Sequence, residues 1–230
     1  MPVYVNIMQS GTLLNLDFYF ENMSFLVAIV KQHIRPYIPE LLQLVQDNWS
    51  HTRVQERIIG LIESIALCLD GEYKSYMPKF LRSMMAILEA DLSSERQQQR
   101  QQQQHHHGNA SFRVLQAVVK LGTNIEEYMH MIIPLLVKTF ERPEAPLNLR
   151  RAAISTIGAL SRRVDLSDHA SRITHALSRI LALPIPELRT ATMDVLCLMV
   201  IQLGQNYLNF APLVRKVTIC HDQYVFLCLV

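Results

Sequence analysis

The sequence predicts an all-α solenoid in which about five helical hairpins are stacked along 230 residues. Apolar residues recur at the spacing of an amphipathic helix in segment after segment, and no segment sustains the apolar–polar alternation of a strand. A proline preceded by large apolar residues opens these segments at a spacing of about 39 residues. Glycine is sparse, with seven residues in the chain, which disfavours a turn-rich β fold.

The proline spacing indicates the size of the repeating unit. Pro39 and Pro78 lie 39 residues apart, and Pro212 follows Pro134 by two such periods. The interval from Pro78 to Pro134 is longer by about 17 residues, which a Gln/His-rich insertion supplies. A period of this size built from two helices is typical of HEAT and armadillo arrays. Such arrays present surfaces to other proteins, so catalytic residues are not the first expectation.

The helical pattern predicts the elements in chain order. The template i, i+3, i+4, i+7 is followed by Ile58, Leu61, Ile62 and Ile65, and other segments repeat it. The predicted helices cover 2–10, 16–31, 37–48, 52–69, 75–91, 111–122, 127–141, 147–164, 168–182, 187–204 and 207–217.

Two of the later helices can be aligned residue by residue. Leu149-Arg150-Arg151-Ala152 matches Leu188-Arg189-Thr190-Ala191 at an offset of 39, and Ile157 then falls on Leu196. Each helix follows a proline-bearing turn, and proline suits the first helical turn because its missing N–H would have no partner there. We therefore expect Ile157 and Leu196 to occupy the same core position one repeat apart.

Residues 93–110 have a different composition, dominated by glutamine and histidine. They offer almost no apolar side chain to bury, so we expect a disordered insertion within one repeat of a solenoid segment spanning 1–230. The three histidines His105, His106 and His107 could bind a transition metal. Without a neighbouring Cys or Asp they do not close a tetrahedral site, so we favour repeat expansion in a tolerant loop and expect no metal site.

Charge and cysteine usage exclude several functional classes. The 22 basic and 20 acidic residues give a net charge of +2, without the basic excess typical of nucleic-acid binding. The four cysteines form no CxxC pair, which favours a reducing, intracellular compartment. Cys68 and Cys197 lie in apolar helical runs and are predicted to be small core residues. The longest apolar run, Val195–Ile201, is too short for a transmembrane segment.

Arginines are dense between residues 142 and 189 and allow two interpretations. One is a groove that binds phosphate or an acidic partner. The other, which we favour, is a solvated helix face on which some arginines pair with Glu144, Asp165, Asp168 or Glu187. HEAT arrays also often place an arginine near the start of the second helix, where it can join neighbouring repeats. The residues concerned are Arg142, Arg150, Arg151, Arg162, Arg163, Arg172, Arg179 and Arg189.

No catalytic constellation is visible in the sequence. There is no phosphate-cradling Gly-rich loop, nucleophile elbow or HExxH motif. Glu126 and Glu127 are adjacent, so on a helix they point about 100° apart. Trp49 is expected to fill a gap between repeats. Several methionines and one tyrosine lie at core spacing and are predicted to be packing residues: Met84, Met85, Met129, Met131 and Tyr128. We therefore assign no catalytic, cofactor-binding or metal residue.

Longer stretches carry a more specific resemblance, namely KQHIRPY at 31–37, GEYKSYMPKFL at 71–81, PLLVKTFERPEAPLNLRR at 134–151, VDLSDHASRITHALSRIL at 164–181 and PELRTATMDVLCLMVIQLGQNYLNFAPLVRKV at 186–217. Over most of 25–217 the chain resembles the central HEAT-repeat region of the target of rapamycin (TOR) serine/threonine protein kinases, which belong to the phosphatidylinositol-kinase-related kinases. It departs from the family pattern in the tract 93–110, in a start within a repeat, and in residues 218–230, so we expect a fragment that is incomplete at both ends.

The resemblance implies a role and partners. It implies a scaffold segment of a kinase that controls growth in response to nutrients, with ATP and Mg bound by a kinase domain downstream and no cofactor here. The implied partners are a second TOR protomer and a raptor- or rictor-type subunit, without nucleic acid. The implied location is cytoplasmic, including endomembrane and lysosomal surfaces reached through the parent complex. The alternative is a stand-alone HEAT adaptor of the nuclear-transport or phosphatase-scaffold type, and an enzyme acting within the chain comes third.

Overall fold

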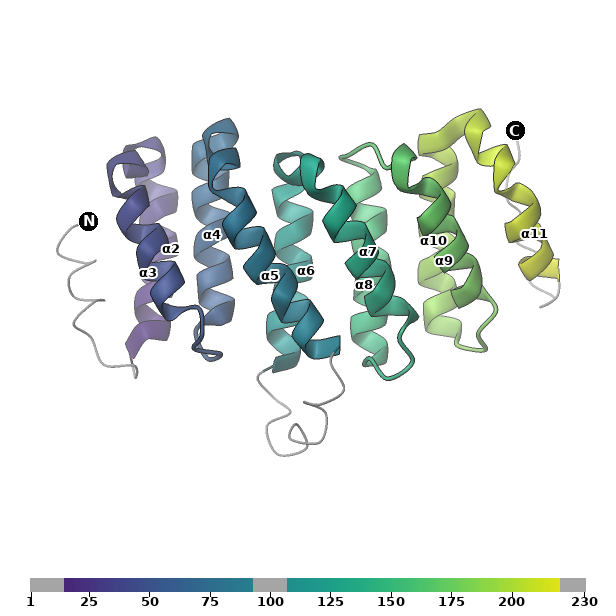
Figure 1. The fold of residues 1–230 in the computed structure, drawn as a ribbon, viewed down its shortest axis with the longest axis horizontal. Helices are drawn as coiled ribbons and strands as arrows, with labels where there is room; N and C mark the ends of the chain where they lie inside the picture. Colours follow the sequence, from purple (N-terminus) through teal and green to yellow (C-terminus); the bar gives the residue numbers. More distant parts are fainter. Residues whose placement is uncertain (1–14, 93–106, 220–230) are drawn as a thin grey trace. The chain divides into compact units, whose positions relative to one another are not determined.

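A computed structural model describes residues 15–92 and 107–219 of the chain. Every regular element in these two ranges is a helix, so the predicted all-α fold is confirmed (Figure 1). The chain divides into two compact units, residues 1–124 and 125–230. Each unit is a row of helices that pack against their neighbours in two layers.

The first unit contains five described α-helices. They are α2 (Leu16–Val30), α3 (Ile38–Asn48), α4 (Gln55–Leu69), α5 (Met77–Leu92) and α6 (His107–Leu121). One layer is formed by α2, α4 and α6, in which α4 packs between the other two. The other layer holds α3 and α5, which lie in front of it in Figure 1. The 3₁₀ segments η2 (Lys31–Tyr37) and η3 (Asp70–Ser75) lead from one layer to the other.

The second unit repeats this plan. Its α-helices are α7 (Met129–Glu141), α8 (Leu147–Ser161), α9 (Ala170–Leu181), α10 (Pro186–Leu203) and α11 (Ala211–Ile219). One layer pairs α8 with α10, and the other aligns α7, α9 and α11. Its 3₁₀ segments are η7 (Ser167–His169) and η8 (Gly204–Asn209), and η6 (Gly122–Tyr128) contains the division between the two units.

The 39-residue alignment of α8 and α10 is confirmed by burial. Ile157 and Leu196 are fully buried. The aligned pair Leu149 and Leu188 is also buried, with 4% and 0% of the residue surface exposed. The two helices approach closely at Gly158, where an added Cβ would lie 3.0 Å from a methyl group of Val195. The sequence repeat is therefore a repeat of core positions.

The predicted helix boundaries agree with the structure to within a few residues, with one informative shift. Helix α6 begins at His107, four residues earlier than expected, because Ala110 and Ser111 are buried in the core of the first unit. The last residues of the expected insertion 93–110 are thus helical. The predicted helix 2–10, residues 93–106 and most of the divergent end 218–230 lie outside the described residues.

Two predicted core residues face solvent instead. Cys197 is exposed because it lies one position after the buried Leu196 on α10, about 100° around the helix. Met131 is exposed for the same reason, since α7 turns Ile132 and Ile133 inward. Met84, Met85 and Met129 are buried as predicted, and Tyr128 is half-buried.

Cys68 and Trp49 are only partly buried. The Cys68 thiol donates a hydrogen bond to the carbonyl of Val27 at 3.5 Å, so it joins α4 to α2. Trp49 lies at the end of α3 and lines a groove of ≈ 220 Å³ beside Phe80. The gap that we expected Trp49 to fill therefore remains open.

The 3₁₀ connectors share an unusual backbone conformation. Three described residues have positive φ, and each comes directly after an α-helix. They are Lys31 after α2 (φ 50°), Gly122 after α6 (φ 46°) and Gly204 after α10 (φ 52°). A buried residue follows three positions later in each case, namely Ile34, Ile125 and Tyr207. The reversed dihedral turns the chain so that this side chain enters the core. Glycine suits this conformation because it has no Cβ, whereas Lys31 holds it under strain.

Candidate functional site

The described residues contain no cluster of three or more His, Cys, Asp and Glu side chains arranged to hold a metal. His105 and His106 lie outside these residues, as does the side chain of His107. None of the described helices is both long and apolar enough to cross a membrane. The candidate sites are therefore surfaces, and three are distinctive: a charged network, an apolar stripe and a basic groove.

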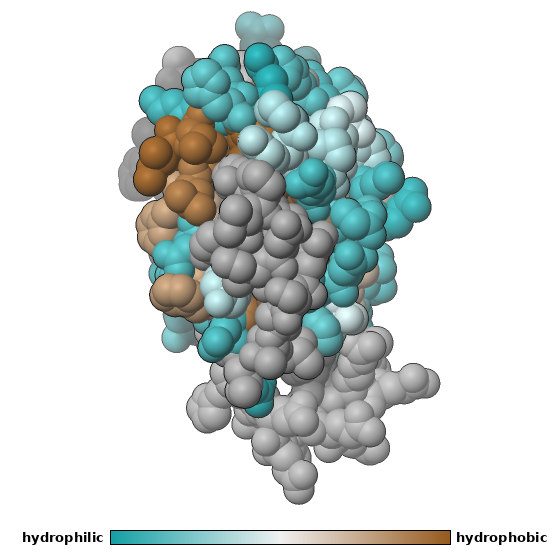
Figure 2. Space-filling view, turned by 90° about the vertical axis from the view of Figure 1, so that its left-hand side faces the viewer, coloured by the Kyte–Doolittle hydropathy of each residue, from teal (hydrophilic) through white to brown (hydrophobic). Residues whose placement is uncertain are grey.

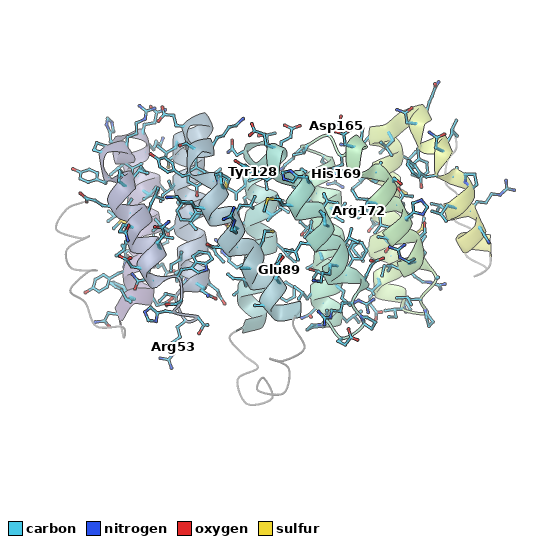
Figure 3. All side chains as sticks on the ribbon, in the orientation of Figure 1. Arg53, Glu89, Tyr128, Asp165, His169 and Arg172 are labelled. Atoms are coloured by element: carbon cyan, nitrogen blue, oxygen red, sulfur yellow. The ribbon has the colours of Figure 1, made fainter. Side chains whose placement is uncertain are left out.

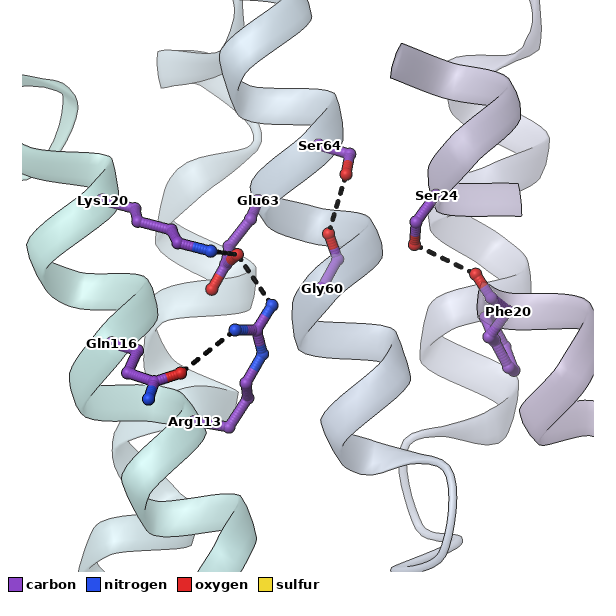
Figure 4. A network of polar contacts seen from close by, with 8 residues as sticks. All are labelled: Phe20, Ser24, Gly60, Glu63, Ser64, Arg113, Gln116 and Lys120. Atoms are coloured by element: carbon purple, nitrogen blue, oxygen red, sulfur yellow. Dashed lines mark hydrogen bonds and ion pairs between the residues drawn. The ribbon is translucent and has the colours of Figure 1, made fainter. Parts of the chain in front are cut away.

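The charged network is centred on Glu63 of α4, whose side chain is only 4% exposed. Its Oε2 accepts hydrogen bonds from Arg113 Nη2 and Lys120 Nζ, both at 2.8 Å and both on α6 (Figure 4). Arg113 also donates to Gln116 at 3.2 Å. A buried carboxylate is costly unless it is paired, so these contacts hold α4 and α6 in one register.

A groove of ≈ 510 Å³ lies beside this network, between α2, α4 and α6. On its other side Arg57 of α4 bridges to α2, donating to Asp17 at 3.2 Å and to Glu21 at 2.9 Å. The charges that line the groove are mixed and largely paired with one another. The lining residues are Glu21, Ser24, Phe25, Glu56, Arg57, Gly60, Glu63, Ser64, Leu67, Arg113 and Lys120. Such a surface holds helices together and gives no net attraction for an ion.

An apolar stripe runs along α2 at the edge of this groove. Phe18, Phe25 and Ile29 are 64%, 62% and 74% exposed, at i, i+7 and i+11 on one helix. Leu67 of α4, also 64% exposed, lines the groove together with Phe25. Figure 2 shows the apolar surface at this end of the first unit. We call these four residues the α2 stripe, and contiguous exposed apolar surface of this kind is typical of interaction sites.

Two arginines near the start of a second helix have a structural role, but each binds the preceding helix of its own hairpin and does not join neighbouring repeats as we expected. Arg150 is 4% exposed and its Nε donates to the carbonyl of Phe140 at 2.8 Å. Arg189, one period later, donates in the same way to Leu181 at 2.9 Å. Both carbonyls are at the C-terminal end of the preceding helix, where no N–H of that helix can reach them. The expected solvated face is therefore wrong for Arg150, and burial lowers the pKa of its guanidinium.

The acidic partners expected for the other arginines are only partly the observed ones. Glu144 pairs with Arg142 at 3.4 Å as predicted. Asp165 instead accepts hydrogen bonds from the hydroxyl and the N–H of Ser167, at 2.6 and 2.9 Å, which lowers the pKa of its carboxyl. Arg179 of α9 donates through Nε to Glu141 of α7 at 2.6 Å, a partner that sequence spacing alone did not suggest.

The basic groove lies between α7 and α9 and has a volume of ≈ 730 Å³. Arg172 reaches it from the start of α9, where Figure 3 labels this residue together with His169. Its cations outnumber its single carboxylate four to one. The lining residues are Pro134, Val137, Lys138, Glu141, Arg142, Arg172 and Arg179. Of the eight arginines in the arginine-rich segment, three therefore line this groove and five lie elsewhere.

Comparison with known proteins finds similarity over nearly the whole chain. No family model matches the chain. The chain is 37% identical over 222 residues, 96% of its length, to the serine/threonine-protein kinase tor1 of Schizosaccharomyces pombe. It is 35% identical over 216 residues to the serine/threonine-protein kinase TOR2 of Saccharomyces cerevisiae, and 34% identical over 201 residues to the serine/threonine-protein kinase mTor of Drosophila melanogaster. The chain spans only 8–9% of the length of these curated relatives.

Proposed function

The chain is a segment that belongs to the TOR serine/threonine-protein kinase family, and we propose that it acts as a HEAT-type scaffold. The kinase that contains it would control growth in response to nutrients. The observation that carries this proposal is the extent of the similarity, which covers nearly the whole chain but less than a tenth of each relative. The stand-alone adaptor is less well supported, because the relatives named above are all kinases.

The architecture supports a HEAT assignment. Hairpins with aligned core positions recur at 39 residues. Arg150 and Arg189 lie at the same offset, and each donates a hydrogen bond to a carbonyl at the end of the preceding helix, a contact that we call the arginine clamp. A hairpin of this kind buries its apolar face only by stacking on neighbours, which leaves long outer surfaces free for other proteins. The segment therefore serves architecture, and ATP and Mg bind elsewhere in the kinase.

The α2 stripe supports a role in protein–protein contacts. Its three aromatic and aliphatic side chains on α2 and Leu67 on α4 face outward from a well-packed core. Phenylalanine is enriched in the buried centres of interfaces, because it removes a large apolar area from water. We propose that a second TOR-type protomer or a raptor- or rictor-type subunit covers this stripe in the assembled complex.

The test uses the full-length kinase that carries this segment, with Phe25→Asp and Ile29→Asp introduced together. We expect the variant to lose co-purification of a differently tagged second copy, or of the raptor- or rictor-type subunit, while its own abundance stays normal. Ile201→Asp is the control, because Ile201 is 79% exposed on α10 and belongs to the second unit, whereas the stripe belongs to the first. If both variants retain every partner at the unaltered level, the stripe is not a contact surface.

A further inference from the structure

The basic groove between α7 and α9 contains two cations without an ion-pair partner among the described residues, Lys138 and Arg172. The other two are engaged, since Arg179 pairs with Glu141 and Arg142 with Glu144. Lys138 and Arg172 are both exposed, so their side chains are available to a partner. Two free positive charges on opposite walls of one groove are the starting point of the inference.

Local structure explains only some of these cations. Lys138 and Arg179 lie in the last turns of α7 and α9, where a positive charge stabilises the negative end of the helix dipole. Arg172 lies in the first turn of α9, where the dipole disfavours a cation. Asp168 precedes it by four residues but does not form an ion pair with it. Helix stability therefore gives no reason for an arginine at position 172.

The spacing of the charges favours a ligand with several negative groups. Arg172 and Arg179 are two turns apart on α9, about 10 Å along the helix axis. Lys138 lies in the last turn of α7, and Arg142 follows the end of that helix in an extended conformation. A site for one phosphate would gather cations and backbone N–H groups around a single point. Here the cations are distributed along the groove, and the apolar Pro134 and Val137 lie among them.

We propose that the groove between α7 and α9 binds an acidic segment of a protein partner, with Asp and Glu side chains against Lys138 and Arg172 and an apolar side chain against the half-buried Pro134. Glu141 and Arg179 form a fixed pair that borders this contact. The groove is open to solvent, so the attraction is screened by salt and acts chiefly on the association rate and on the choice of partner.

The experiment measures fluorescence anisotropy of a labelled peptide of Asp, Glu and Leu residues titrated with the 230-residue chain. The test variant is K138E/R172E, and the control is R151E/R162E, which makes the same charge change at two exposed arginines outside the groove. We expect the test variant to weaken binding at least about tenfold and the control to change it less than about twofold. Circular dichroism of both variants verifies that the helical content is retained.

Three results would overturn the proposal. Equal weakening by both variants would mean that the peptide responds to net charge alone, and unchanged binding in the test variant would place the contact elsewhere. Tighter binding of a peptide whose only negative groups are phosphoserines would identify the groove as a phosphate site. The double variant K138Q/R172Q gives a second measurement of peptide affinity, because it removes the two positive charges without adding negative ones. We expect it to weaken binding less than K138E/R172E and more than the control.

Discussion

Lys31 is expected to destabilise the chain through its backbone conformation, and its replacement by glycine should stabilise it. The residue has φ 50° and ψ −127°, while its N–H still donates to the carbonyl of Val27 at the end of α2. Gly204 has nearly the same dihedrals, φ 52° and ψ −127°, at the end of α10. No atom lies within 4 Å of a Cβ built on Gly204, so strain rather than crowding distinguishes the two residue types there.

The size of the effect follows from two opposing terms. A side chain held in this region of φ and ψ costs about 1–3 kcal/mol. Glycine loses more conformational freedom on folding, which offsets about 0.4–1 kcal/mol of the gain. Lys31→Gly should therefore raise the free energy of unfolding by about 1 kcal/mol, or a melting temperature by about 2–4 °C for a chain of this size. Gly204→Ala should lower it by a similar amount.

Urea denaturation followed by circular dichroism at the helical minimum would measure these changes. Lys31→Ala is the control, because it removes the same charge from the end of α2 but keeps the strained conformation. The informative quantity is the difference between the two Lys31 variants, in which the lost interaction with the helix dipole cancels. If Lys31→Ala is as stable as Lys31→Gly, the strain at positive φ is no larger than the entropic cost of glycine, and the reasoning fails.

Three further predictions concern packing and ionisation, each measured by urea or thermal unfolding. Ile157→Ala and Leu196→Ala should each cost about 2–5 kcal/mol, whereas Arg151→Ala on the surface should cost under about 0.5 kcal/mol; equal effects would mean that the 39-residue register is wrong. Gly158→Ala should lower the free energy of unfolding. The new methyl group would lie too close to α10, at a cost of about 1–3 kcal/mol, which outweighs the gain in helix propensity of about 1 kcal/mol. A rise in stability would show that α10 can move away without strain. Burial raises the pKa of Tyr207 to about 12, because it disfavours the phenolate in the folded state; the free energy of unfolding should therefore fall as the pH rises from 10 toward 12, where only the unfolded chain ionises readily. Tyr207→Phe should reduce that alkaline loss and leave neutral stability unchanged or slightly higher, because the buried hydroxyl has no hydrogen-bond partner; an unchanged alkaline profile would contradict the assignment.

The repeat and its core could be predicted because they depend on periodicity alone. Aligning α8 with α10 at an offset of 39 places Ile157 and Leu196 correctly, since burial on a helix follows directly from position around its axis. Cys197 was misassigned because an apolar run does not reveal which face of a helix is covered. Arg150 was misassigned because the sequence shows its charge but not the unpaired carbonyl of Phe140 that it satisfies.

The candidate surfaces were harder to predict than the core. Helix α2 is apolar nearly all round, so its sequence does not reveal that Phe25 and Ile29 face outward. The arginine-rich segment did suggest a groove for an acidic partner as one of two interpretations. Which arginines share that groove depends on how α9 packs beside α7, and residues 138 and 172 meet there across more than thirty positions of sequence.

The hydrogen bonds from Arg150 to Phe140 and from Arg189 to Leu181 also bear on how the turns of the second unit can vary. In both hairpins of the second unit the guanidinium is attached to the end of the preceding helix, although eight residues separate the pair in one case and ten in the other. The angle within each hairpin is thus fixed independently of the length of its turn, and mutation can alter the turn without changing the hairpin. Successive hairpins are joined by polar contacts as well as apolar ones, since Arg179 of α9 donates to Glu141 of α7 and Gln202 of α10 donates to the carbonyls of Ser161 and Val164. Because these bonds have a defined direction, they hold one hairpin in register on the next, so the turns are the parts of the second unit whose length can change at least cost to the rest.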